Sequence, residues 1–132
     1  MNIDNNAHSV FLLRYHLILT TQYRYSVFDD IVSKHAKEIF ERIAADYNIR
    51  LEEWSYKPDY IHIVFRAHPN TELSKFINAY KSASSRLIKK DIPRIRSLLW
   101  NDRFWSQSFF LLTEGTVSDD VIAEYVSQQK ML

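Results

Sequence analysis

Hydrophobic and polar residues alternate in two stretches of this chain, a pattern typical of half-buried strands. In residues 9–21 one face would carry Leu13, Tyr15, Leu17 and Leu19, and the other Arg14, His16, Ile18 and Thr20. In residues 57–68 one face would carry Ile61, Ile63 and Phe65, and the other Tyr60, His62, Val64 and Arg66. Each strand therefore combines an apolar core face with a face that bears a histidine and an arginine. The alternative interpretation of the second strand is a half-solvated edge strand with an incidental histidine.

Apolar residues then recur at helical spacing from Phe28 to Tyr47, which predicts an amphipathic helix. Ser26 is the predicted N-cap, with Asp29 three residues later as in a capping box. Asn48 is the predicted end of the helix. This helix has the pattern of a scaffold element.

Residues 72–90 predict a second amphipathic helix, capped by Asn70 or Thr71. Its polar side carries donors suited to phosphate oxygens, namely Lys75, Asn78, Lys81, Ser82, Ser85, Arg86 and Lys89. Eight basic and two acidic residues lie between Leu73 and Thr113, so this part has a local charge of 8 − 2 = +6 in a chain of net charge +1. The pattern indicates either a surface for a polyanion or a solvated charged helix.

The remaining segments complete a sheet. Residues 50–56 predict a strand that forms a hairpin with the strand in residues 57–68 through Pro58 and Asp59. Residues 95–100 predict a short helical piece, and residues 102–113 predict a fourth, aromatic strand.

The C-terminal segment predicts a last helix. Gly115 precedes it as a predicted hinge, and Ser118 is the predicted N-cap. Tyr125 and Gln129 lie four residues apart and therefore share a helix face. On the residues alone, the preferred interpretation of Tyr125 is a buried tyrosine of an amphipathic helix.

The order of elements predicts an α+β fold of the ferredoxin-like, split β-α-β type. In this fold two helices cover one face of a four-stranded antiparallel sheet. The face with His62 would stay open unless the terminal helix covers it.

Composition adds limits to this picture. The 132 residues suffice for one domain, and 46% of them are hydrophobic. The absence of cysteine excludes disulfides and thiolate metal sites. We expect a soluble cytoplasmic protein with no membrane partner, because no signal peptide or membrane-length apolar run is present.

Four stretches together resemble the small single-strand DNA transposases (TnpA) of the HUH single-tyrosine class. They are YHLILTTQYR, LSKFINAYKSASSRLIKK, RFWSQSFFLL and VSDDVIAEYVSQQ. The resemblance implies one domain over residues 1–132, with a ferredoxin-like core at 8–113 and a catalytic helix at 116–130. It also implies a tyrosine that attacks single-stranded DNA and becomes linked to the 5′ phosphate.

By this resemblance Tyr125 is the nucleophile, and His62 and Gln129 are ligands of a divalent ion, Mg²⁺ or Mn²⁺. The family also works as a homodimer, in which the tyrosine helices can be exchanged, and recognises DNA hairpins at the ends of the element. The predicted DNA contacts are Arg14, Lys75, Lys81, Arg86, Lys89 and Lys90.

The sequence departs from the family pattern at Tyr60, where the first histidine of the His-hydrophobic-His motif is expected. Three explanations are open. Tyr60 impairs metal binding, Tyr60 coordinates as a phenolate, or His16 or His68 substitutes for the missing ligand. We favour impaired metal binding.

The leading functional prediction is therefore a transposase that cleaves and rejoins single-stranded DNA. The alternative is a cleavage-impaired, hairpin-binding variant of that enzyme. A third interpretation, an RNA-binding ferredoxin-like domain, is weakened because the strands lack the aromatic and glycine signature of such modules.

Overall fold

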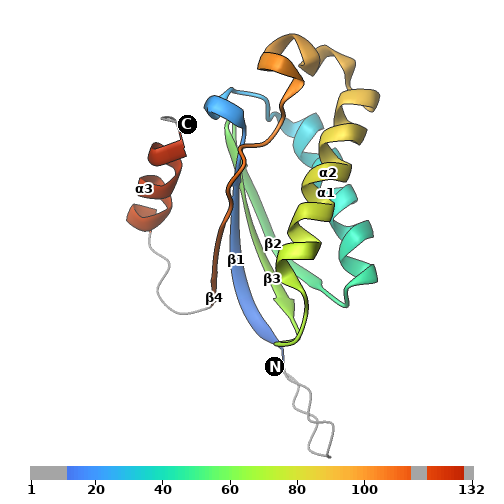
Figure 1. Ribbon diagram of the computed structural model, residues 1–132, viewed down its shortest axis with the longest axis vertical. Helices are drawn as coiled ribbons and strands as arrows, with labels where there is room; N and C mark the ends of the chain where they lie inside the picture. The colour runs from blue at the N-terminus through green and yellow to red at the C-terminus, as the bar shows by residue number, and fades with distance from the viewer. Residues whose placement is uncertain (1–11, 114–118, 130–132) are drawn as a thin grey trace, which may run out of the picture.

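A computed structural model describes residues 12–113 and 119–129 of the chain (Figure 1). Its centre is a four-stranded antiparallel sheet in the order β2-β3-β1-β4. The strands are β1 (Leu13–Thr20), β2 (Arg50–Lys57), β3 (Tyr60–Ala67) and β4 (Phe110–Thr113). The long helices are α1 (Asp30–Asp46) and α2 (Leu73–Asp91), and the terminal helix is α3 (Asp119–Gln129).

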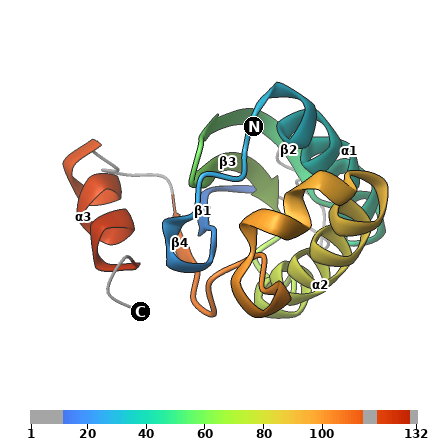
Figure 2. The ribbon, with the colours of Figure 1, turned by 90° about the horizontal axis from the view of Figure 1, so that it is seen from above.

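The helices are divided between the two faces of the sheet. Figures 1 and 2 show α1 and α2 side by side on one face and α3 on the other. The predicted ferredoxin-like α+β arrangement is confirmed. β3 lies between β2 and β1, so the interpretation of the His62 strand as an edge strand is wrong.

An aromatic cluster holds α1 and α2 on the sheet. The Phe40 ring of α1 lies 5.3 Å from the Phe76 ring of α2 and 6.1 Å from the Phe65 ring of β3, measured between centroids. The buried Tyr80 hydroxyl donates a hydrogen bond of 3.0 Å to the carbonyl of Ala36, which joins the two helices directly. Edge-on ring contacts of this kind stabilise a core beyond the area that they bury.

The N-caps of α1 and α2 differ from those predicted. Asp29, not Ser26, caps α1, and its carboxylate accepts a 2.9 Å hydrogen bond from the Val32 amide. Residues 26–28 stay outside the helix because Val27 and Phe28 turn into the core instead. Glu72 occupies the N-cap of α2 without a side-chain hydrogen bond, so the predicted caps Asn70 and Thr71 are also wrong. The predicted end of α1 is right, because Asn48 has the positive φ of 55° that asparagine tolerates there.

The predicted fourth strand is mostly wrong, because only Phe110–Thr113 of residues 102–113 pair as β4. Before β4, Trp105 makes an isolated antiparallel bridge with Thr21, and the Ser106 amide donates to the Thr20 carbonyl at 2.9 Å. Lys81 of α2 donates to the carbonyls of Ser106 at 2.7 Å and Ser108 at 3.3 Å. The Trp105 indole donates to the Ser84 hydroxyl at 2.9 Å. These side-chain bonds to α2 accompany the single bridge, and residues 102–109 form no continuous strand ladder.

Three short 3₁₀ turns complete the described chain: η1 (Gln22–Arg24), η2 (Pro93–Leu98) and η3 (Trp100–Asp102). The second confirms the predicted helical piece, shifted towards Pro93. Gly115 and Ser118 lie outside the described residues. None of the helices in the described part of the chain has the length and apolarity of a membrane span.

We expect Asp29→Ala to lower the free energy of unfolding by about 1 kcal/mol at neutral pH, because α1 loses its N-cap. The Val32 amide, with help from the Arg94 guanidinium at 2.6 Å, holds the pKa of Asp29 below its ordinary value. The contribution is therefore present above about pH 4 and fades as the pH falls through the lowered pKa. Chemical denaturation at several pH values measures it.

Asp29→Asn is the matched control, because asparagine also caps helices but carries no charge. It should lose less stability than Asp29→Ala. An equal loss in both variants would assign the effect to the ion pair with Arg94 rather than to the cap.

Candidate functional site

The sheet face opposite α1 and α2 carries the polar residues of β1 and β3. Antiparallel pairing sets Ile18 against His62, and His16 against Val64. Alternation then places both histidines on the face away from the aromatic core. The Nδ1 of His16 lies 3.0 Å from the Nε2 of His62. Two imidazoles predicted on separate strands thus meet at one point.

Helix α3 covers part of the same face. Ile122 and Val126 are buried against Ile18 of β1. Tyr60 of β3 and Tyr125 of α3 pack at the edge of this small cluster. The expectation that the terminal helix covers the open face is therefore confirmed, and Tyr125 lies on it.

A chain of hydrogen bonds ties α3 to the segment before β4. The Ser108 hydroxyl donates to the side-chain oxygen of Gln129 at 2.7 Å and lies 3.0 Å from the Tyr125 hydroxyl. Because a serine has one hydroxyl proton, the Tyr125 hydroxyl is the donor to Ser108. The phenol is thus protonated in this arrangement. Burial raises the pKa of Tyr125, although the bond to Ser108 partly opposes that effect.

The residues predicted to form one metal and tyrosine site line three different hollows. His62 and Tyr60 line one of about 490 Å³ together with Ile122. Gln129 lines another of about 310 Å³, and Tyr125 a third of about 240 Å³. In the described residues, no three His, Asp or Glu side chains gather closely enough to hold a metal ion. The inherited ligand set, with a phenol at position 60, therefore does not fit an ion within one chain.

The predicted DNA contacts divide into two groups. Lys81 is half-buried and bonded to two carbonyls, and burial lowers its pKa. Lys89 pairs with Asp102 at 3.2 Å, and Arg14 pairs with Glu52 at 2.8 Å. These three cations hold the fold together. The exposed cations of α2 are Lys75, Arg86 and Lys90.

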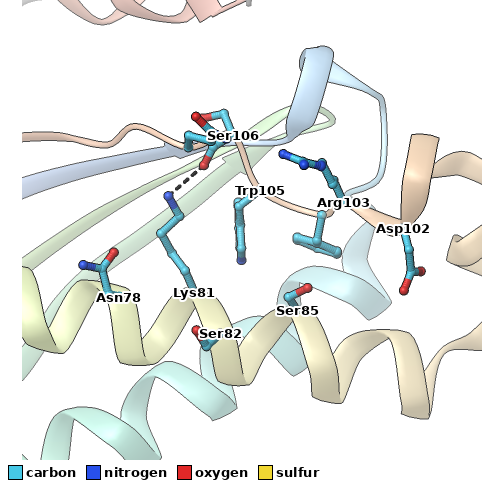
Figure 3. A pocket seen from close by; sticks show the side chains of 10 residues that line it. Asn78, Lys81, Ser82, Ser85, Asp102, Arg103, Trp105 and Ser106 are labelled. Carbon is cyan, nitrogen blue, oxygen red and sulfur yellow. Dashed lines mark hydrogen bonds between the residues drawn. The ribbon is translucent and has the colours of Figure 1, made fainter.

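A hollow of about 480 Å³ lies between α2 and the segment before β4 (Figure 3). Its lining includes the polar side chains of Asn78, Lys81, Ser82, Ser85, Arg103 and Gln107, and the carboxylate of Asp102, which pairs with Lys89 and Arg96. Figure 3 shows Lys81 pointing from α2 to Ser106 across this hollow. Amide, hydroxyl and guanidinium donors together can bind phosphate oxygens.

Sequence reasoning missed Ser108. It has no charge and no place in a periodic pattern, and its importance depends on α3 returning to lie beside it. Only the tertiary structure brings the three hydroxyl and amide groups together.

We expect Ser108→Ala to loosen α3, because both hydrogen bonds from the helix to this residue are removed. Each bond contributes about 1 kcal/mol, so loss of both should accelerate amide hydrogen exchange in residues 122–129 by about thirtyfold. Exchange followed by mass spectrometry measures it. Gln107→Ala is the control, since that neighbouring side chain is exposed. Equal exchange in both variants would show that Ser108 does not secure α3.

Comparison with known proteins places this geometry in a family. The family model described as "Transposase IS200 like" matches residues 9–129. The ISDra2 transposase TnpA of Deinococcus radiodurans is 30% identical over 120 residues, which are 91% of this chain and 86% of that protein.

Solved structures agree. A crystal structure assigned as a transposase from Deinococcus radiodurans R1 superposes with a TM-score of 0.82 and 31% identity, covering 96% of this chain and 98% of that one. The fold also resembles a REP-associated tyrosine transposase bound to a REP hairpin, with a TM-score of 0.59 and 10% identity over 94% of this chain and 68% of that one. The chain belongs to the IS200-like transposase family.

Proposed function

We propose that this protein cleaves and rejoins single-stranded DNA at the ends of an insertion sequence through a phosphotyrosine intermediate on Tyr125. The observation that carries the proposal is the position of Tyr125. It lies on a helix that packs over the histidine-bearing face of a sheet with this family's fold. Because the family's members are transposases, a tyrosine at that place is the natural nucleophile.

The proposed cleavage and rejoining can be described with atoms of this chain and of the DNA. The Tyr125 oxygen attacks a backbone phosphorus and forms a phosphotyrosine bond to the 5′ side. The bond from phosphorus to the 3′ oxygen breaks, and that oxygen leaves as a 3′ hydroxyl after taking up a proton. Attack by a 3′ hydroxyl on the phosphotyrosine reverses the step and restores the phenol. No nucleotide cofactor is needed, because each step exchanges one phosphodiester for another.

The docked state of Tyr125 indicates that α3 moves before cleavage. The phenol donates to Ser108 and its pKa is raised by burial, whereas a nucleophile needs a deprotonated oxygen. We propose that α3 leaves Ser108 and places Tyr125 beside a histidine face, its own or that of a second copy. Exchange of α3 in a homodimer would bring Tyr125 and Gln129 to the His62 side of the partner.

The DNA surface that we propose follows α2. Lys75, Arg86 and Lys90 are exposed along it. Arg103 reaches the neighbouring hollow, which Asn78 also lines. A REP-associated tyrosine transposase of similar fold is bound to a REP hairpin, which supports hairpin DNA as a ligand of this protein.

A second candidate function is a hairpin-binding protein with impaired cleavage. Tyr60 favours it, because this phenol packs beside Ile122 and Val126 where the family has a histidine. The family's Mg²⁺ or Mn²⁺ would then be held weakly.

The first test is a covalent-adduct assay. Labelled single-stranded DNA from the element ends is incubated with the protein in Mn²⁺ buffer and separated on a denaturing gel. We expect an adduct that Tyr125→Phe abolishes, and Tyr47→Phe as a control should retain it. An adduct that persists in Tyr125→Phe would refute the assigned nucleophile, and an adduct seen only with Tyr60→His would favour the binding-only function.

A separate test addresses the DNA surface. We expect the double variant Arg86→Glu, Lys90→Glu to bind hairpin DNA more weakly. The slope of log affinity against log salt should become shallower by about 0.7–0.9 for each phosphate that the protein no longer neutralises. Fluorescence anisotropy at several salt concentrations measures both. The matched control reverses two exposed lysines of α1, Lys34 and Lys37, and equal effects in the two variants would refute a specific role of α2.

A further inference from the structure

The turn η1 brings an unsatisfied polar group to the hollow beside α3. Gln22 is only 8% exposed, and its side-chain oxygen is buried without a hydrogen-bond partner among the described residues. Gln22 lines the hollow of about 310 Å³ that Gln129 also lines. A buried amide oxygen that accepts no hydrogen bond is unfavourable in free energy. The position therefore favours a ligand that supplies a donor.

The main chain fixes Gln22 in this place. Its amide donates to the Phe104 carbonyl at 2.9 Å, and its carbonyl accepts from the Tyr25 amide at 3.2 Å. The preceding residue, Thr21, forms the isolated bridge with Trp105. The backbone of Gln22 is thus bonded to its surroundings, and the side-chain oxygen is the group left for a ligand.

An aromatic ring stands next to this oxygen. Tyr23 lines the same hollow and is 37% exposed. Its ring meets the exposed Trp100 ring at an interplanar angle of 74°, with centroids 5.7 Å apart. The φ of Tyr23 is 55°, a left-handed value that is uncommon for a bulky residue. The fold therefore holds this ring at the surface against its local preference, and such rings are platforms on which unpaired bases stack.

The charge of the hollow suits a nucleotide. Arg103 lines it, and none of the described residues that line it is acidic. Arg103 also lines the hollow beside α2, so one guanidinium borders both the proposed DNA surface and this second hollow. Guanidinium groups bind phosphate oxygens well. On the other side lies Gln129, which shares Ser108 with Tyr125. A nucleotide held here would lie beside the helix of the proposed nucleophile.

We propose that this hollow binds one unpaired base of single-stranded DNA and so selects part of the sequence that is cleaved. Tyr23 stacks on the base, the Gln22 oxygen accepts a hydrogen bond from its amino group, and Arg103 pairs with its phosphate. Ligand pockets measure about 300–1,000 Å³, so a hollow of about 310 Å³ accepts a single base.

Adenine is the base that we expect to be preferred. An amide side chain presents a donor and an acceptor side by side, and adenine offers an amino donor beside a ring-nitrogen acceptor. Binding of the base by Gln22 and Tyr23 needs no cleavage, whereas its role in selecting the cleaved strand rests on the proposed function.

The test is binding of five-nucleotide DNA strands in EDTA, where no metal is present. The central residue is deoxyadenosine, the same purine nucleoside without the amino group, or an abasic sugar, and the other four are thymidines. Fluorescence anisotropy of labelled strands measures the affinities. We expect the adenine strand to bind about fivefold more tightly than the purine strand, because one hydrogen bond contributes about 1 kcal/mol. The abasic strand should bind most weakly, because it has no base to stack.

Variants of the two side chains separate the hydrogen bond from the stacking. Gln22→Leu should abolish the preference for adenine over purine, because leucine has a similar size but no acceptor. Tyr23→Leu should weaken binding of both strands by about fivefold or more, since stacking contributes about 1–3 kcal/mol per base. Tyr23→Phe is the matched control, because it keeps the ring and should retain the affinity.

Equal affinity for the adenine and purine strands would overturn the inference, as would a preference that survives Gln22→Leu. Should a variant fail to fold, NMR of the unchanged protein decides. The adenine strand should shift the amide signals of residues 22–24 and 103–107, and shifts confined to α2 would refute the site. If the preference is found but Tyr125 forms no DNA adduct, the proposed cleavage fails and the base site stands. An adduct without the preference leaves the cleavage and removes the base site.

Discussion

The antiparallel register of β1 on β3 is the constraint on which the rest of the structure depends. It pairs Leu17 with Ile63 and Tyr15 with Phe65. These four side chains complete the core beneath α1 and α2. The same register brings His16 and His62 together on the opposite face. Because strand residues alternate, a slip of one residue would bury a histidine in the core and break the pair. Core packing therefore fixes the geometry of the polar face.

The terminal helix depends on this face in turn. Ile122 and Val126 seat α3 on Ile18, and Ser108 ties Tyr125 and Gln129 to the segment before β4. The contacts that hold α3 are therefore two buried apolar side chains and two hydrogen bonds to one serine. In this docked arrangement the Tyr125 phenol donates to Ser108 and is protonated.

The basic residues of α2 have two separate uses. Lys81 and Lys89 donate to carbonyls and a carboxylate of the segment between α2 and β4. They hold in place a stretch that makes few ladder bonds. Arg86 and Lys90 remain exposed to solvent. A local charge of +6 in the sequence thus overstates the charge available to a polyanion, because Lys81 and Lys89 are bonded to groups within the protein.

The sequence by itself determined the class of the fold. Period-two alternation in β1 and β3 and helical spacing in α1 and α2 follow from local geometry, so the core face of each element could be predicted from residues such as Ile61 and Phe76. Local pattern also separated His62 from the core. It failed where a segment takes its hydrogen bonds from distant groups, as between Asp102 and Phe109. There the backbone makes one isolated bridge, at Trp105, and hydrogen bonds to Lys81 and Ser84 tie the segment to α2.

Only the tertiary structure decided which polar residues meet. His16 and His62 are 46 residues apart in sequence, and Ser108 meets Tyr125 and Gln129 only because α3 folds back over the sheet. Contacts of this kind depend on register and on packing between elements, which no local pattern encodes. Local residue patterns thus determine which face of each element is apolar and which is polar. The register of the sheet and the packing of α3 on Ile18 determine which polar side chains meet.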